Sequence, residues 1–460
     1  MSLQVPALEG RSSIRRLLAP ISGLLSLRYF VLRCFTAAGG LASGLLQTFV
    51  FARVVSARDF SIFVLIGSIG VGLWLFDLGA AKILYVRQRE RHLTRCKDDA
   101  LPAQSNAVVV LYFLIVLFGS ALCFAVTASQ ATITVWQGVQ FAAFFSFSAL
   151  NLVWLPLRTV SNAIDEFITF EVLEAVRRIG HITMMLLLLV GLPLSAFLLL
   201  ANLLWFAVFA ANIVQLVGKG ALLPRLRGGR QALARFWSDN RLEILSSANF
   251  AVSERVLYNF PYIIVPIAFG LGSPTIILDT VFKILRGAML ICSAGLDPLV
   301  PRQTRAFAEH DIVTLRKATW TATILCAAPT LVLCVLLLVA GDRFFGLLLG
   351  HAATMPREVN VIIVILLVAN LAQCVASTLL VCTGFFREMA RVAIVMVAAT
   401  AAMTAIVLAG KANIVTFIAG YAGVYVLGAA LYIWYVKRKI FIEHQRQALP
   451  LFANEIGVDS

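Results

Sequence analysis

Apolar residues recur along most of this chain in runs of about 20 residues, separated by short segments rich in charge, proline or glycine. A helix of that length crosses the hydrocarbon core of a bilayer, which is about 30 Å thick. The runs predict twelve spans, at residues 29–52, 60–80, 105–127, 132–156, 172–191, 194–217, 246–270, 274–297, 318–340, 358–382, 390–410 and 413–436. The pattern therefore predicts an all-α polytopic membrane protein.

Composition and charge support this reading. Of the 460 residues, 60% are hydrophobic and only 13% are charged, and the mean hydropathy is +0.91, more apolar surface than a water-soluble fold can bury. Most of the 38 Lys and Arg residues lie in the segments on one side of the predicted topology, as cytoplasmic loops do. We therefore expect both termini in the cytoplasm. The net charge of +15 resides in these loops, so no nucleic-acid partner is expected.

The longest internal connection divides the chain into two sets of six spans. We expect a cytoplasmic N-terminal basic segment (1–28), a first six-helix bundle (29–217), a cytoplasmic basic linker (218–245), a second six-helix bundle (246–436) and a cytoplasmic C-terminal tail (437–460). The two halves are alike in the placing of their charges, and repeats of this kind commonly hold a substrate pathway at their interface. A central cavity between the bundles is therefore predicted.

The segment RSSIRRLLAPISGLLSLR, residues 11–28, mixes Arg with Leu and Ile. This mixture is typical of a helix that lies on anionic membrane lipids. The alternative is a disordered basic tail that only fixes the topology.

Span eight contains LDTVFKILRGAML, residues 278–290, in which three charges occur within eight residues. A charge at the bilayer centre costs about 2.5–3.5 kcal/mol on insertion scales, so such groups should face protein or water. Helical spacing puts them on one polar stripe with other polar residues, namely Thr275, Asp279, Lys283, Arg286, Ser293 and Asp297. The stripe fits a helix that lines a hydrated cavity. The alternative is a local pair of Asp279 with Lys283, four residues apart, which leaves Arg286 without a local partner.

Other spans carry isolated polar groups. Glu254 and Arg255 lie in span seven, where Pro261 and Pro266 can bend the helix. Glu254 and Asp279 are candidates for ion coupling, although either could form a static ion pair. Four amides are candidates for contact with sugar hydroxyls, or else for bonds between helices: Gln47, Gln140, Asn370 and Gln373.

The charges counted within the spans sum to +2, which favours an anionic passenger. Arg and Lys are the natural partners of phosphate, so four residues are predicted to contact a phosphate or pyrophosphate group in the cavity: Arg33, Arg255, Lys283 and Arg286. For Arg33, which is close to the membrane surface, the alternative is a side chain that reaches out to the interface. The five histidines have no nucleophile beside them, and no G-x-x-x-x-G-K-[ST] loop is present. An enzyme is therefore not expected, nor is a cofactor or a metal site.

Three stretches of the chain resemble the polysaccharide biosynthesis proteins, the flippases for lipid-linked oligosaccharides within the multidrug/oligosaccharidyl-lipid/polysaccharide exporter superfamily. They are FARVVSARDFSIFVLIGSIGVGLWLFDLGAAKILYVRQRER at 51–91, LDPLVPRQTRAFAEHDIVTLRKA at 296–318 and RFFGLLLGHAATMPREVNVIIVILLVANLAQCVASTLLVCTGFFREMARV at 343–392. With the twelve-span plan, the resemblance covers nearly the whole chain.

The resemblance implies two bundles around a cationic cavity that works by alternating access. It further implies a bacterial inner-membrane flippase that moves undecaprenyl-pyrophosphate-linked oligosaccharide for O-antigen, capsule or exopolysaccharide synthesis, beside other polysaccharide assembly proteins. Two alternatives stay open. One is a multidrug or organic-cation antiporter of the same superfamily, and the other is a membrane-embedded polysaccharide polymerase or ligase, an enzyme.

Overall fold

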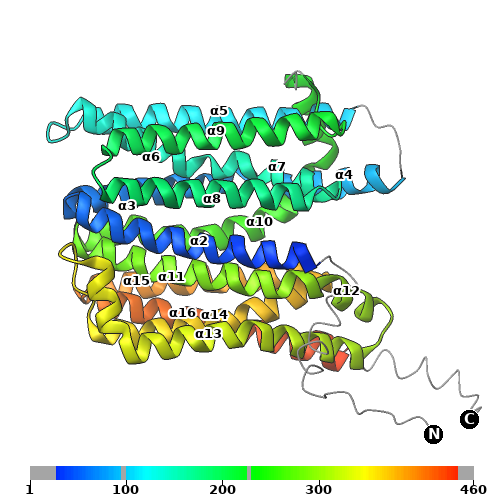
Figure 1. Ribbon diagram of the computed structural model, residues 1–460. Helices are drawn as coiled ribbons and strands as arrows, with labels where there is room; N and C mark the ends of the chain where they lie inside the picture. The colour runs from blue at the N-terminus through cyan, green and yellow to red at the C-terminus, as the bar shows by residue number, and fades with distance from the viewer. Residues whose placement is uncertain (1–26, 95–99, 225–228, 444–460) are drawn as a thin grey trace, which may run out of the picture.

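The computed structural model describes residues 27–94, 100–224 and 229–443, and every regular element within these ranges is a helix (Figure 1). The side chains of residues 27–30, of 245–255 and of a few further positions are outside this description. The predicted N-terminal segment and C-terminal tail therefore lie outside the described residues, apart from residues 27–28 of the segment and 437–443 of the tail.

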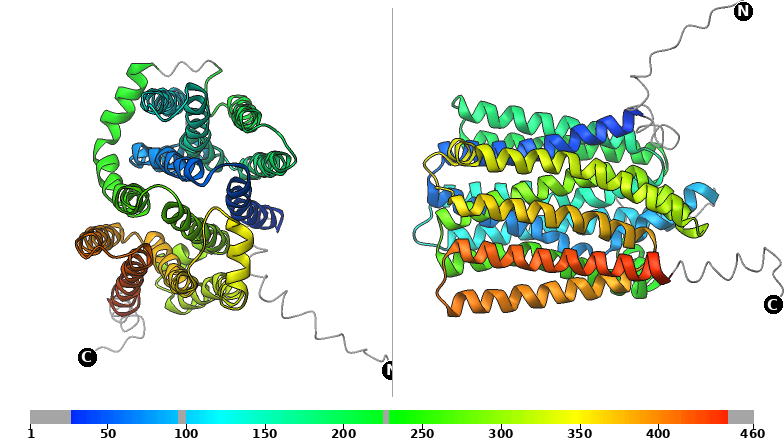
Figure 2. Two further views of the ribbon diagram at one scale, coloured as in Figure 1. Left: turned by 90° about the vertical axis from the view of Figure 1, so that its left-hand side faces the viewer. Right: turned by 90° about the horizontal axis from the view of Figure 1, so that it is seen from below.

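The helices form two bundles that lie side by side (Figures 1 and 2). The first bundle comprises α2 Leu27–Val54, α3 Ala57–Gly72, η2 Leu73–Asp77, α4 Ala80–Thr94, α5 Ala100–Ala128, α6 Val135–Ala149, α7 Asn151–Ala163, α8 Phe167–Leu189 and α9 Leu194–Gly218. The second comprises α10 Arg230–Phe269, α11 Ser273–Leu296, η3 Asp297–Leu299, α12 Val300–Ala308, α13 Ile312–Leu349, α14 Arg357–Cys382, α15 Phe386–Ala409, α16 Ile414–Tyr435 and η4 Val436–Glu443.

Within the described ranges, twelve segments cross the molecule, as the sequence predicts. Among the described residues, nine are long and apolar enough by composition to cross a membrane. The other three crossing helices are α8, α10 and α11, which run alongside them (Figure 1); α8 and α11 carry charges within the span. The molecule also exposes large apolar side chains, such as Phe118 at 72% and Val339 at 82%. Lipid accounts for that surface, and the all-α fold in two bundles is confirmed.

Two helices extend beyond their predicted spans. Helix α10 begins at Arg230, inside the segment predicted as a linker, and α13 runs on to Leu349. At 1.5 Å per residue, the 38 residues of α13 are about 57 Å long, well beyond a hydrocarbon core of about 30 Å. Charged residues such as Asp342 and Arg343 interrupt the apolar runs, so hydropathy did not predict that these helices continue through them.

The sequence D-L-G at residues 77–79 ends the second span and separates η2 from α4. Leu78 and Gly79 adopt positive φ values of 46° and 85°. Asp77 then caps α4, because its carboxylate accepts from the backbone N–H of Gly79 at 3.2 Å and of Ala81 at 3.0 Å. The hydroxyl of Tyr112 on α5 also donates to Asp77, at 2.7 Å. The break is thereby fixed to its neighbouring helix.

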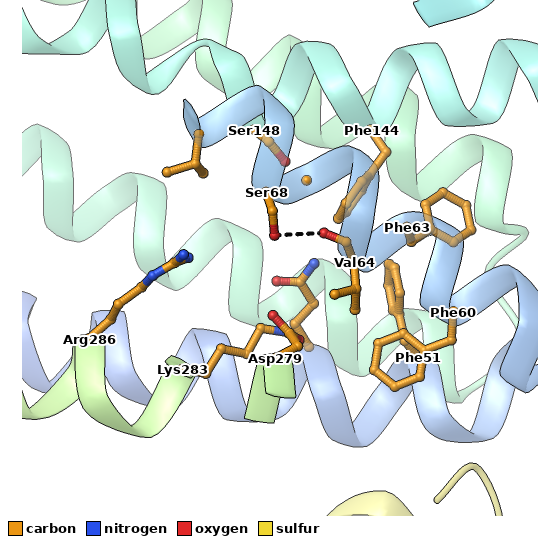
Figure 3. A pocket seen from close by; sticks show the side chains of 13 residues that line it. Phe51, Phe60, Phe63, Val64, Ser68, Phe144, Ser148, Asp279, Lys283 and Arg286 are labelled. Atoms are coloured by element: carbon orange, nitrogen blue, oxygen red, sulfur yellow. Dashed lines mark hydrogen bonds and ion pairs between the residues drawn. The ribbon is translucent and has the colours of Figure 1, made fainter. Parts of the chain in front are cut away.

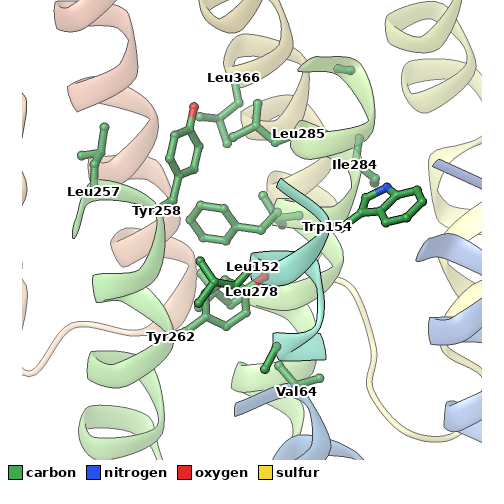
Figure 4. Close-up of a cluster of buried hydrophobic side chains, with 14 of the residues drawn as sticks. Val64, Leu152, Trp154, Leu257, Tyr258, Tyr262, Leu278, Ile284, Leu285 and Leu366 are labelled. Carbon is green, nitrogen blue, oxygen red and sulfur yellow. The ribbon is translucent and has the colours of Figure 1, made fainter. Parts of the chain in front are cut away.

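The proline at position 261 lies inside α10. Proline lacks an N–H, so the carbonyl four residues earlier loses its helical partner. That carbonyl belongs to Leu257, and the hydroxyl of Tyr421 on α16 donates to it at 3.1 Å. A bond between helices therefore replaces the helical bond that Pro261 removes. Figure 4 shows the apolar packing around this point, where α10 and α11 meet residues such as Leu366 of α14.

Helix α2 lies between the two bundles and packs against α8 on one side and α11 on the other. Glycines allow the approach to α11: a Cβ on Gly287 would overlap the side chain of Leu41, and one on Gly40 would lie 3.1 Å from Leu290. We call the end of the molecule where α2 begins and α16 ends the terminal end, and the other the opposite end (Figure 1).

The bundles also touch near both ends. At the opposite end, Arg53 of α2 donates to the carbonyls of Leu347 at 2.5 Å and Leu348 at 3.4 Å, in the last turn of α13. At the terminal end, the ammonium of Lys82 on α4 lies 3.9 Å from the ring centre of Phe386 on α15. Cross-bundle contacts therefore exist on both sides of the central region.

Candidate functional site

Two cavities follow α2 through the centre of the molecule. The one towards the opposite end, which we call the Lys283 cavity, has a volume of about 90 Å³ and is lined by residues of α2, α3, α6 and α11 (Figure 3): Gln47, Phe51, Phe60, Phe63, Val64, Gly67, Ser68, Val71, Phe144, Ser148, Asp279, Lys283 and Arg286. The one towards the terminal end, the Arg158 cavity, has about 120 Å³ and is lined by Arg33, Thr36, Ala37, Trp74, Asn151, Trp154, Leu155, Arg158, Phe170, Glu171, Glu174, Arg177, Arg178 and Leu290.

The Lys283 cavity has a charged side and an aromatic side. Figure 3 shows Asp279, Lys283 and Arg286 of α11 apart from the phenylalanines of α2, α3 and α6. The ammonium of Lys283 lies 2.7 Å from the carboxylate of Asp279 and donates to the hydroxyl of Thr48 at 3.0 Å. The hydroxyl of Tyr262 donates to the same carboxylate at 3.1 Å. Lys283 is therefore neutralised within its own helix, as the local-pair interpretation predicted.

Arg286 is the charge of this stripe that has no counter-ion among the described residues. No carboxylate of that part of the chain lies within ion-pair distance of its guanidinium, which instead sits 5.3 Å from the ring centre of Tyr262. The group lines the cavity and is only partly buried. A guanidinium with free donors beside a cavity can bind an anion by several parallel hydrogen bonds.

In the Arg158 cavity, Arg33 of α2 joins both bundles. Its guanidinium lies 3.1 Å from Glu171 of α8 and 3.4 Å from Asp297 at the end of α11. The second oxygen of Glu171 accepts from the hydroxyl of Thr36 at 2.7 Å. The Glu171 side chain is 3% exposed and that of Asp297 is 43% exposed. Arg33 is thus held firmly within the first bundle and more loosely across to the second.

Helix α8 adds a second buried ionic group. Arg177 and Arg178 both donate to Glu174, at 2.5–2.9 Å. Arg177 also lies 4.0 Å from the ring centre of Trp205. One turn further on, His181 shares a hydrogen bond of 2.9 Å with the hydroxyl of Ser43 on α2. The His181–Ser43 bond joins α8 to α2, and the Arg177–Trp205 contact joins it to α9.

Arg158 of α7 differs from its neighbours. It lies in the electric field of Glu171, Glu174 and Asp297, but within the described part of the chain no carboxylate comes within ion-pair distance of it. The carboxylates around it are already paired with other arginines. Arg158 therefore resembles Arg286: each lines a cavity and has no counter-ion in the described part of the chain.

Cations outnumber carboxylates in both cavities. The Arg158 cavity is lined by four arginines and by two glutamates. The Lys283 cavity is lined by Lys283 and Arg286 against Asp279. Both cavities therefore favour negative charge, which agrees with the sign, though not with the members, of the charge sum predicted from the sequence.

The remaining predicted residues lie in several places. Gln47 lines the Lys283 cavity, whereas Gln140, on α6, lines neither cavity. Asn370 and Gln373 are on α14 inside the second bundle, where Asn370 is 1% exposed. The side chains of Glu254 and Arg255, on α10, fall outside the described residues.

Sequence reasoning missed the charges of α7 and α8, namely Arg158, Glu171, Glu174, Arg177, Arg178 and His181. The count of charges within the spans therefore needs correction, because Arg177 and His181 are buried at 5% and 6% exposure inside the first bundle. The available signal was the spacing of three and four residues in EVLEAVRRIGH, 171–181, which puts most of these groups on one helical face.

No family model matches the chain, and no curated protein matches it by sequence. Solved structures do resemble it over most of its length. A MOP superfamily transporter from Pyrococcus furiosus, described as having a binding pocket of reverse polarity that suggests a different function, is 12% identical with a TM-score of 0.61, covering 94% of this chain and 98% of its own.

Two further structures resemble the chain to a similar degree. A mutant of the Vibrio cholerae MATE transporter VcmN is 10% identical with a TM-score of 0.62, covering 94% of this chain and 99% of its own. The eukaryotic MATE transporter AtDTX14 is 13% identical with a TM-score of 0.59, covering 94% and 98%. The chain therefore has the two-lobed fold seen in these MATE and MOP superfamily structures.

Proposed function

We propose that the protein is a flippase that moves an oligosaccharide linked to undecaprenyl pyrophosphate across the bacterial inner membrane, for surface polysaccharide synthesis. The terminal end would face the cytoplasm, because the basic segments lie on that side of the predicted topology. The two bundles would rock about α2, the cavities would bind the pyrophosphate, and the lipid tail would stay in the bilayer.

The observation that carries the proposal is a pair of guanidiniums, Arg158 and Arg286, each beside a cavity along α2 and each without a counter-ion in the described part of the chain. A buried charge is costly unless it is paired. A protein that keeps two such cations next to its transport pathway is suited to an anionic passenger. For the Pyrococcus furiosus transporter, a binding pocket of reverse polarity is described as suggesting a different function. The charge of the pocket is therefore a reasonable guide to function among proteins with this fold.

A complementation assay tests the proposal, in a bacterial strain that lacks its own copy of the protein. We expect Arg286→Gln to lower surface polysaccharide at least tenfold, and the double variant Arg158→Gln with Arg286→Gln to abolish it. Arg357→Gln is the matched control, since that side chain is 88% exposed and 4.0 Å from Asp342. Full surface polysaccharide in the double variant, at normal protein levels, would refute the proposal.

An organic-cation antiporter is the second candidate. The observation in its favour is that Asp279 and four phenylalanines line the same Lys283 cavity, since carboxylates and aromatic rings attract cations. Its test is resistance to a lipophilic cation such as ethidium. Resistance that depends on Asp279, without any dependence on Arg286, would favour this candidate over the flippase.

A further inference from the structure

The Arg158 and Lys283 cavities lie one after the other along the same two helices. On α2, Ala37 lines the first cavity and Gln47 the second. At 1.5 Å per residue, these two residues are about 15 Å apart along the helix. On α11, which runs in the opposite direction, Leu290 lines the first cavity and Arg286 the second. The two cavities therefore follow one another beside both helices.

Small residues of α2 lie between the cavities. A Cβ on Gly40 would be 3.7 Å from the guanidinium carbon of Arg178, and one on Gly44 would be 3.9 Å from Cγ of Lys283. Gly40 and Gly44 are one helical turn apart, so cations from the two bundles border α2 at successive turns. Cationic side chains from both bundles thus border the Gly40–Gly44 face of α2, where Leu290 of α11 also approaches Gly40.

The Arg158 cavity is built for an anion because its carboxylates are already occupied. Both oxygens of Glu171 accept hydrogen bonds, from Arg33 and Thr36. Glu174 accepts from two arginines of its own helix. Neither carboxylate is within ion-pair distance of Arg158, so an entering phosphate would meet free guanidinium donors there.

We propose that the Arg158 cavity is a separate binding site for a phosphate or diphosphate group, used before the Arg286 site, and that the Gly40–Gly44 face of α2 connects the two. The proposal rests on the proposed function and deepens it, because it divides the path of the anionic head group into two stations. Arg158 binds the group on the cytoplasmic side, and Arg286 binds it closer to the outer side.

Calorimetric titration of the full chain in lipid nanodiscs with inorganic pyrophosphate tests the two stations. We expect two binding events in the unchanged protein. Arg158→Gln should weaken one of them at least tenfold and leave the other within twofold. Arg286→Gln should do the reverse, and Arg158→Lys should retain both events because it keeps the charge. Arg357→Gln serves as the control.

Other outcomes would overturn the proposal. If Arg158→Gln leaves pyrophosphate binding unchanged while Arg286→Gln removes it, the Arg158 station is wrong and the proposed function survives. If Arg158→Gln weakens both events equally, lowers the melting temperature and is not rescued by Arg158→Lys, Arg158 is structural. If the unchanged protein binds no pyrophosphate at all, the proposed function itself fails.

The connection between the stations has its own test. Gly44→Leu would fill the space beside Lys283, so we expect both binding events to persist while surface polysaccharide falls at least tenfold. Gly423→Leu on α16 is the control, because nothing lies within 4 Å of a Cβ there. Normal polysaccharide in Gly44→Leu would exclude this face of α2 as the connection.

Discussion

The ammonium of Lys283 lies 2.7 Å from the carboxylate of Asp279, one turn away on α11. Breaking a buried pair leaves an uncompensated charge, which costs about 3–5 kcal/mol. Lys283→Met should therefore lower the melting temperature of the purified protein more than the double change Asp279→Asn with Lys283→Met does. A double variant as unstable as the single one would show that the two side chains do not act as a pair.

Tyr421 and Pro261 form a second pair that can be tested in the same way. Tyr421→Phe removes the donor to the Leu257 carbonyl, and a buried unsatisfied polar group costs about 1–3 kcal/mol. We expect a clear loss of thermal stability. Pro261→Ala restores a backbone N–H to α10 and should recover part of that loss, measured as a smaller effect of Tyr421→Phe when Pro261→Ala is already present. Equal effects with and without Pro261→Ala would contradict this account.

The close approach of α2 and α11 predicts a steric pair. Gly287→Val places a branched side chain against Leu41, and overpacking of this kind costs about 1–3 kcal/mol. Leu41→Ala alone should be mildly destabilising. Combined with Gly287→Val, it should restore stability towards that of the unchanged protein, which a melting curve in detergent can measure. A sum of the two separate losses would indicate that the helices do not meet here.

The contacts of Arg53 predict that this side chain holds the opposite end closed. Its bonds to the last carbonyls of α13 join the bundles there, and a cation is favourable at a helix C-terminus. Arg53→Gln should raise the rate at which a membrane-impermeant maleimide labels a cysteine introduced at Ser68, in a background without native cysteines. The reagent is added on the side that the proposed orientation places outside the cell. Arg58→Gln, in the first turn of α3, is the control. An unchanged labelling rate would show that Arg53 does not hold this end closed.

Much of this fold follows from local sequence. The runs of apolar residues identify the crossing segments, and a spacing of four residues predicts the contact of Asp279 with Lys283. The contacts of Arg33 could not be predicted, because Glu171 and Asp297 are more than a hundred residues away in the chain. Helical periodicity indicates which face of a helix carries a charge, but it does not indicate which other helix packs against that face.

The arginines of α8 show a different difficulty. Arg177 and Arg178 lie in the first half of the predicted span 172–191, which begins on the side of the basic segments. From the sequence, they are therefore expected to extend towards that side of the membrane. Only the packing of α8 against α2 and α7 reveals that they point inward, towards Glu174 and the cavity.

The ionic groups of α8 also bear on how the protein enters the membrane during synthesis. Glu171, Glu174, Arg177 and Arg178 make this segment a poor substrate for insertion by itself, at about 2.5–3.5 kcal/mol for each charge near the bilayer centre. The partners of Glu171, Arg33 and Thr36, belong to α2 and are synthesised earlier. Helix α8 can therefore enter the bilayer next to α2, which is already in the membrane. The assembly of the first bundle then depends on the order in which its helices are translated.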